Sequence, residues 1–151
     1  MLRSLIVVFV CTVLSTTAFA ADNGLIKKKS AHSVAVTLDR LEKILKEKGI
    51  GIAVRWNHSA KAKSVGMDLR DTEILIFGNP KMGTPLMISN QEIGIDLPMK
   101  ALAYKDATGQ VWLVYNDPAY MKARHGIKDK DPVFEKMTGA LNAMTDKATA
   151  K

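Results

Sequence analysis

The chain has 151 residues, of which 22 are Lys or Arg and 15 are Asp or Glu, and it contains a single Cys. Its hydrophobic content of 47% and charged content of 25% are typical of a globular protein and exclude an intrinsically disordered chain. One Cys cannot form an intramolecular disulfide, and it excludes iron–sulfur clusters and zinc sites that need several thiolate ligands.

The first twenty residues have the pattern of an export signal. Arg3 is their only charged side chain, an apolar stretch runs from Leu5 to Leu14, and the segment ends on Ala18-Phe19-Ala20. This order is typical of a secretory signal peptide, so we expect cleavage after Ala20 and a periplasmic protein. Removal of these 20 residues would leave 131 residues with a formal charge of +6, no Cys and no apolar run long enough to span a bilayer.

The first elements after the cleavage site are predicted from charge and periodicity. Residues 21–29 form a polar leader, in which Lys27-Lys28-Lys29 is typical of a solvated tether. The alternation over Ser33–Thr37 predicts a first strand, and Thr37 then caps a helix over Leu38–Lys48 with one apolar stripe. Strict alternation from Ile50 to Asn57 predicts a half-buried second strand.

The middle of the chain predicts one central strand between less regular segments. We expect a short helical turn over residues 59–66, then a strand over Glu73–Phe77 that is apolar enough to be buried on both faces. Asn79-Pro80 has the form of a helix cap followed by proline at the first helical position. Because Gly83 and Pro85 disfavour a continuous helix, we expect a tight turn, a short helix to about Gln91 and a loop over residues 93–98.

The last third of the chain predicts a hairpin and two helices. Lys100–Tyr104 and Gln110–Tyr115 flank a turn at Asp106-Ala107-Thr108-Gly109. Asp117-Pro118 opens a short helix that ends at Gly126. A longer C-terminal helix begins at Asp131-Pro132, and its apolar stripe consists of Phe134, Met137, Leu141, Met144 and Ala148.

These elements predict one α+β domain over residues 30–149. Their order is β-α-β-β-α-β-β-α with a final helix, and hairpin connections favour a mainly antiparallel sheet with helices packed on one face. No Gly-rich phosphate loop, HExxH or GxSxG motif is present in the sequence. The three His and seven Met of the mature chain have no metal-ligand spacing, so we expect neither a metal nor another cofactor.

Two segments carry the candidate site residues. Asn79, Lys81 and Thr84 follow a strand, where a helix start, a positive charge and a hydroxyl favour an anion. The second segment begins at the end of another strand and supplies aromatic, amide and basic side chains: Tyr115, Asn116, Tyr120, Arg124 and His125. His58, further upstream, is a second candidate histidine. We expect Asp117 to cap a helix.

Three stretches together resemble the DUF302 family, a domain family of unknown function: FGNPKMGTPLM at residues 77–87, GIDLPMKALAY at 94–104 and GQVWLVYNDPAYMKARHGI at 109–127. The resemblance covers about residues 30–148 and implies a compact α+β domain, but no activity. The matching positions are rich in Asn, Thr, Tyr and His, which implies a shared polar ligand site near the ends of the third and fifth strands.

The favoured interpretation is a periplasmic module that binds a small, anionic ligand or a partner from the envelope, rather than an enzyme. An enzyme with His58 or His125 as general base is one alternative. The other is a structural or envelope-stress protein that binds anionic surfaces through its basic face. Because an exported protein rarely meets nucleic acid, we expect no nucleic-acid partner, and we expect no stable membrane span after cleavage.

Overall fold

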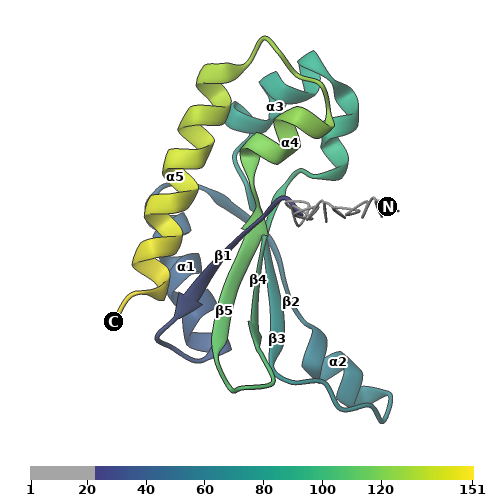
Figure 1. The fold of residues 1–151 in the computed structure, drawn as a ribbon, viewed down its shortest axis with the longest axis vertical. Helices are drawn as coiled ribbons and strands as arrows, with labels where there is room; N and C mark the ends of the chain where they lie inside the picture. The colour runs from purple at the N-terminus through teal and green to yellow at the C-terminus, as the bar shows by residue number, and fades with distance from the viewer. Residues whose placement is uncertain (1–22) are drawn as a thin grey trace, which may run out of the picture.

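An antiparallel sheet organises residues 23–151, which are the residues that this computed structural model describes (Figure 1). The predicted signal peptide therefore lies outside the described residues. The five strands, in the spatial order β1-β5-β4-β3-β2, all pair antiparallel. Their bounds are Leu25–Ser30 (β1), Gly51–Asn57 (β2), Thr72–Gly78 (β3), Met99–Lys105 (β4) and Val111–Asn116 (β5).

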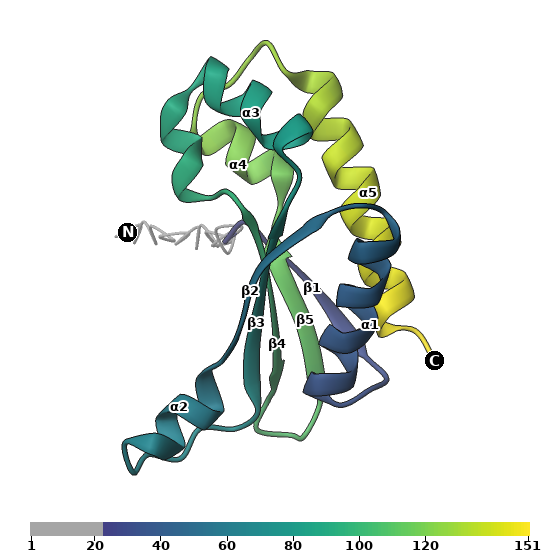
Figure 2. The same cartoon turned by 180° about the vertical axis from the view of Figure 1, so that it is seen from behind.

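The helices divide between one face and the two ends of this sheet. Figures 1 and 2 show α1 (Val34–Glu47) and α5 (Asp131–Thr149) on the same face. At one end of the sheet lie α3 (Pro80–Ser89), the 3-10 helix η1 (Gln91–Ile95) and α4 (Pro118–Arg124), whereas α2 (His58–Ser64) projects from the opposite end. The predicted α+β class and antiparallel sheet are confirmed.

The core lies between the covered face of the sheet and these two helices. Leu38, Leu41 and Leu45 of α1 are fully buried against Leu75 of β3 and Leu113 of β5. Full burial of such a side chain stabilises the fold by about 1.5–3 kcal/mol. On the same face, α5 contributes the predicted stripe, in which Phe134, Met137, Leu141, Met144 and Ala148 are all buried.

The prediction of a polar leader before the domain was wrong, because part of this segment forms an edge strand of the sheet. Residues 25–30 form β1, which pairs with β5 in a register that runs from Leu25 opposite Asn116 to Ser30 opposite Val111. Lys28 points toward the helices, where its Nζ lies 2.6 Å from Asp146 Oδ1. The tether prediction was wrong because three consecutive lysines can alternate between the two faces of an edge strand.

The predicted strand over Ser33–Thr37 was also wrong, since these residues begin α1. Ser33 is the cap, and its hydroxyl accepts a hydrogen bond from Val36 N. Val34, Thr37, Leu38 and Leu41 are buried at helical spacing, whereas Val36 is 43% exposed. Five residues of alternation were too short to separate a strand from the first turn of an amphipathic helix.

The segment after β3 differs from the prediction in continuity. A helix, α3, runs without interruption from Pro80 through Pro85, and η1 occupies most of the predicted loop. Pro85 lies in the second turn and forfeits one backbone hydrogen bond, to the carbonyl of Lys81, which a ten-residue helix tolerates. The predicted positions of β2, the β4–β5 hairpin, α2, α4 and α5 are confirmed, as is Asp117 as the cap of α4.

Strand β3 is an interior strand of the sheet, between β2 and β4, but it is not buried on both faces as predicted. Leu75 and Phe77 are buried, while Ile74 and Ile76, which point to the other face, remain partly exposed. This difference arises because α1 and α5 both lie on one side of the sheet. The opposite face of the strands is uncovered over much of its area.

Candidate functional site

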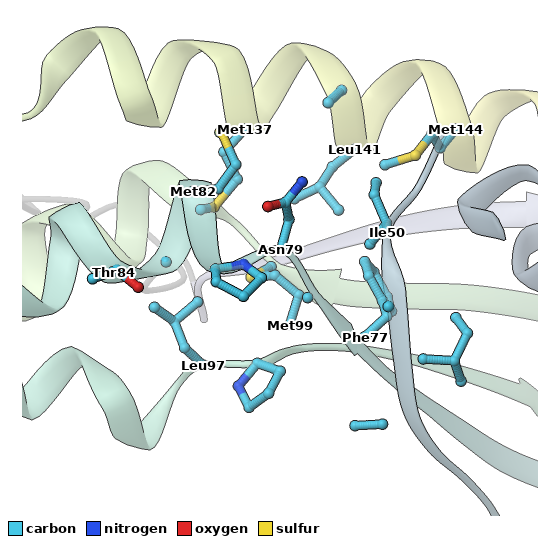
Figure 3. A pocket seen from close by; sticks show the side chains of 18 of the residues that line it. Ile50, Phe77, Asn79, Met82, Thr84, Leu97, Met99, Met137, Leu141 and Met144 are labelled. Carbon is cyan, nitrogen blue, oxygen red and sulfur yellow. The ribbon is translucent and has the colours of Figure 1, made fainter. Parts of the chain in front are cut away.

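A pocket of about 530 Å³ lies where the sheet, α3 and α5 meet (Figure 3). The start of β2, the end of β3 and the start of β4 form its floor, and α3 and α5 form its walls. The end of β3 approaches the β4 side closely, since a Cβ at Gly78 would lie 3.2 Å from the Cβ of Pro98. The Leu97–Pro98 peptide bond at this point is cis.

The lining of this pocket is apolar and rich in thioethers. Five methionines contribute to it: Met82, Met87, Met99, Met137 and Met144. Ile50, Phe77, Leu97 and Leu141 supply further apolar surface. No Asp, Glu, Lys, Arg or His is among the described residues that line it. Unbranched, polarisable methionine side chains adapt to ligands of different shape, so the lining favours an apolar molecule over an ion.

Asn79 and Thr84 are the two side chains in the lining that offer hydrogen bonds. Asn79 caps α3, because its Oδ1 accepts a hydrogen bond from Lys81 N at 2.9 Å. Figure 3 shows its amide pointing toward α5, near Met137 and Leu141. Among the hydrogen bonds of residues 23–151, none involves Asn79 Nδ2 or Thr84 Oγ1, so both groups are available to a ligand.

Asn79 and Thr84 are the two predicted site residues that line the pocket, and the other seven lie elsewhere. Lys81 sits between them on α3, is exposed and does not line the cavity. The Tyr115 hydroxyl donates to Asn142 Oδ1 at 2.8 Å on the covered face. Tyr120 packs against Gly24 at the start of the described chain, and the exposed His58 begins α2 at the opposite end of the sheet.

A separate cluster of polar side chains lies outside the pocket. It brings three of the predicted site residues together around an aspartate that was not among the predicted site residues. Asp96 follows η1 and is 7% exposed. Its Oδ2 lies 2.6 Å from His125 Nε2, and its Oδ1 lies 3.4 Å from Arg124 Nη1 and 3.5 Å from Asn116 Nδ2. Asn90 fixes the same region, because its Nδ2 donates to the carbonyl of His125 at 2.8 Å.

The residues that sequence reasoning missed are mostly apolar. The methionines of the pocket come from α3, β4 and α5, and in sequence they are indistinguishable from core methionines. Asp96 had a clearer signal, because it is an isolated carboxylate between Ile95 and Leu97 in an apolar segment. Within the described part of the chain, no three His, Cys, Asp or Glu side chains cluster as a metal site would require.

Comparison with known protein families identifies the fold and the family. The model of the family described as "Domain of unknown function DUF302" matches residues 26–144. The chain belongs to this family. A crystal structure of an uncharacterised DUF302 protein from Bacillus stearothermophilus superimposes with a TM-score of 0.75 over 84% of this chain and 99% of that chain. At 20% sequence identity, this likeness establishes the shared fold.

The chain also matches part of larger proteins. The chain is 46% identical over 106 residues to a protein named fluoride-specific ion channel FluC 1 of Brucella suis and to one named FluC 2 of Brucella melitensis. The match covers 70% of this chain but only 42% and 39% of these relatives. The chain thus spans about two fifths of their length. No helix in residues 23–151 combines the length and apolar character that crossing a membrane requires.

Proposed function

We propose that this DUF302 protein binds a small, mainly apolar molecule that carries one hydrogen-bond acceptor. The supporting observation is the pocket of about 530 Å³, whose lining is apolar except for Asn79 and Thr84. Ligand pockets typically have volumes of about 300–1,000 Å³ and combine an apolar wall with a few polar groups that fix orientation. The apolar body lies among the methionines, and a carboxylate, carbonyl or hydroxyl oxygen accepts a hydrogen bond from the Asn79 amide.

This proposal refines the expected anionic ligand. The lining lacks a charged side chain, so an ion with no apolar body would lose its hydration without compensation. Fluoride, which the names of the Brucella relatives suggest, is such an ion. An amphiphilic anion remains compatible, because its carboxylate can lie beside Asn79 at the N-terminal end of α3. With residues 1–20 as an export signal, the proposed site of action is the periplasm.

The test is calorimetric titration of the purified protein with decanoate, 1-decanol and fluoride. We expect decanoate and decanol to bind and to raise the melting temperature, and fluoride to do neither. The pocket-filling variant is Gly83→Leu, because a Cβ at Gly83 would make ordinary contact with Leu97 Cδ1 at 3.6 Å and extend toward the cavity. We expect it to weaken decanoate binding at least ~10-fold, a loss of about 1.4 kcal/mol.

Gly139→Leu is the matched control. Gly139 also lies inside a helix, a Cβ there would meet nothing within 4 Å, and it does not line the pocket. Both variants replace a helical glycine by a good helix former, so neither should unfold the protein. Decanoate affinity that is equal in the two variants, or no binding by either decanoate or decanol, contradicts the proposal.

A second candidate function is general-base catalysis at His125, and the observation that favours it is the contact with Asp96. A hydrogen bond from Nε2 to Asp96 leaves the lone pair on Nδ1, the nitrogen that would accept a proton. His58 takes no part, because it lies at the other end of the sheet. A panel of p-nitrophenyl esters and phosphates tests this role. Turnover that Asp96→Asn and His125→Gln both lower at least ~10-fold would support it, and turnover unaffected by them would exclude it.

A further inference from the structure

The face of the sheet opposite α1 and α5, which we call the open face, carries three large aromatic side chains at one end: Trp56, Tyr104 and Trp112. Tyr104 of β4 and Trp112 of β5 are directly paired, and Trp56 lies on β2 in the adjoining row of the register. Ala103 and Leu113, their neighbours along the strands, are fully buried on the covered face, so Tyr104 and Trp112 point the other way. Trp56 is 45% exposed, and the other two rings remain partly accessible.

Lysines lie over the faces of these rings. Lys27 Nζ lies 4.1 Å from the centre of the Trp112 ring, and Lys29 Nζ lies 5.6 Å from it. Lys61 Nζ, from α2, lies 5.0 Å from the centre of the Trp56 ring. Within residues 23–151, none of these three lysines forms an ion pair with a carboxylate. This end of the open face therefore combines aromatic rings with uncompensated positive charge.

An exposed apolar stretch continues from the same end of the sheet. We call it the α2 arm and define it as residues 58–71, which follow β2 directly. Helix α2 has no buried residue, and every residue from 63 to 71 is exposed. Three of these residues are large and apolar: Val65 at 70%, Met67 at 65% and Leu69 at 48% exposure. Figures 1 and 2 show α2 projecting from the sheet on the side away from α1 and α5, so the core cannot cover these side chains.

The arm and the aromatic end of the open face are together net positive. The charged side chains of the arm are Lys61, Lys63, Arg70, Asp68 and Asp71. Asp71 is already paired, because Lys105 Nζ lies 3.2 Å from its Oδ2. Asp106, in the turn between β4 and β5, accepts a hydrogen bond from Trp112 Nε1 at 2.7 Å. Asp68 is thus the one carboxylate here without a partner among the described residues, and it faces several unpaired cations.

We propose that the α2 arm and the aromatic end of the open face bind the surface of a bilayer that contains anionic phospholipids. Exposed aliphatic side chains beside basic ones are the combination by which interfacial segments enter the headgroup region. Trp and Tyr rings are favoured at the depth of the headgroups, and lysines near the surface are attracted to anionic lipids. The arm therefore places Val65, Met67 and Leu69 deepest, with the rings and the lysines at the level of the phosphates.

The aliphatic tip of the arm selects lipid over other anionic partners. An anionic glycan or a nucleic acid would pair with the lysines and stack on the rings, but it offers no apolar phase for three exposed aliphatic side chains. A second copy of the chain is disfavoured, because the arm and the open face both carry net positive charge. Since α2 projects from the sheet, the arm can reach a bilayer ahead of the rest of the domain.

The test is co-sedimentation of the purified protein with phospholipid vesicles, with tryptophan fluorescence as a second readout. We expect binding to vesicles of equal parts phosphatidylglycerol and phosphatidylcholine, and at least ~10-fold weaker binding to phosphatidylcholine alone. Raising the salt concentration from about 0.1 M to about 1 M should weaken binding, because salt screens the lysines. Trp56 and Trp112 are the two tryptophans of the chain, so the emission maximum should shift to the blue as their surroundings become less polar.

Two double variants separate the apolar and the electrostatic contributions. Met67→Ser/Leu69→Ser removes two apolar anchors without changing the charge, and Lys61→Gln/Lys63→Gln removes two positive charges. We expect each to weaken binding to the phosphatidylglycerol vesicles at least ~10-fold. All four side chains are exposed, so the fold should persist, with an unchanged far-ultraviolet circular dichroism spectrum.

Each double variant has a matched control elsewhere on the molecule. Ile88→Ser replaces an apolar residue of α3 that is 78% exposed, at the other end of the sheet. Lys43→Gln/Lys136→Gln removes two exposed lysines from α1 and α5, which lie over the covered face. Neither control should change binding. All variants keep residues 1–22, so binding that depended on this segment would be equal in all of them.

Four results would overturn the proposal. Absence of binding to the phosphatidylglycerol vesicles excludes it, including the case in which the protein binds heparin, an anionic glycan, instead. Equal binding to both kinds of vesicle shows that the lysines take no part. Affinity that either double variant leaves unchanged places the contact elsewhere. Tryptophan emission that does not shift in the bound protein removes the aromatic end of the open face from the contact.

Discussion

The imidazole of His125 and the carboxylate of Asp96 are joined by a contact of 2.6 Å between Nε2 and Oδ2, although 29 positions separate them in the chain. Both side chains are nearly inaccessible, with 6% and 9% of their surface exposed. The contact attaches the C-terminal end of α4 to the segment between η1 and β4. Polar groups held this way at the end of the sheet fix the geometry around the start of β4.

Truncation of Asp96 should therefore destabilise the protein. Asp96→Ala leaves the buried imidazole of His125 without its acceptor and removes the longer contacts to Arg124 and Asn116, and an unsatisfied buried group costs about 1–3 kcal/mol. Urea unfolding measures the change. Asp68→Ala is the control, because its exposed side chain has no partner within residues 23–151, and we expect a change within about 0.5 kcal/mol. Equal stability of the two variants would contradict the structural role of Asp96.

Gly24 should not tolerate a side chain. Its φ is +69°, and a Cβ there would lie 2.2 Å from Cγ of Tyr120, closer than any real contact. Gly109 has a similar φ of +85°, but a Cβ there meets nothing within 4 Å. Gly24→Ala should thus lower the melting temperature by more than Gly109→Ala, because both substitutions incur backbone strain of about 1 kcal/mol and only the first displaces a ring. Melting temperatures lowered equally would show that Tyr120 is not held against Gly24.

Asn79→Asp should distinguish the role of Asn79 as the cap of α3 from its role in ligand binding. The aspartate keeps the oxygen that accepts from Lys81 N, so the melting temperature should change little. It replaces the amide donor by a negatively charged acceptor, so decanoate should bind at least ~10-fold more weakly, and decanol should be affected less. Titration of both compounds checks this. Unchanged decanoate affinity would remove Asn79 from the site.

The stabilising effect of Asp106 should depend on pH. Hydrogen bonds, chiefly from the Thr108 hydroxyl and then from Trp112 Nε1, lower the pKa of Asp106 to about 2. Because the folded-state pKa lies below the unfolded value of about 3.9, the ionised group stabilises the fold above that pH. This contribution disappears as the pH falls toward 2. Asp106→Asn should lower the melting temperature at pH 7, and the difference should shrink steadily below pH ~4.

Trp112→Phe provides a check on the same group, because it removes the indole donor and leaves the Thr108 bond in place. The melting temperature of Trp112→Phe should also lie below that of the wild type at pH 7, and this difference should also shrink as the pH falls. The change with pH should be smaller than for Asp106→Asn. A melting-temperature difference for Asp106→Asn that is the same at pH 7 and near pH 2 would contradict the assignment.

Local periodicity and caps in the sequence determined most elements of the fold. The stripe from Phe134 to Ala148 and the turn at Asp106–Gly109 each depend on neighbours within a few positions, and each formed as predicted. Strand β2 also formed, but its predicted alternation is broken by a register shift between Ile52 and Val54, which places these two side chains on opposite faces of the sheet. The same local rules failed at residues 25–30 and 33–37. The strand β1 exists because it pairs with Val111–Asn116, and a pairing about 86 positions away leaves no local signal in three lysines.

The candidate site residues likewise divide into those that the sequence indicated and those that only the structure revealed. The sequence identified Asn79 and Thr84 at one position and Asn116, Arg124 and His125 at another, all near the ends of β3 and β5. Only the tertiary structure decided that these residues belong to two separate clusters, that methionines from three elements line the cavity beside the first, and that Asp96 joins the second. Periodicity reports which side of an element is buried, whereas a pocket depends on how several elements pack. For the same reason, the structure alone revealed that one face of the sheet is uncovered.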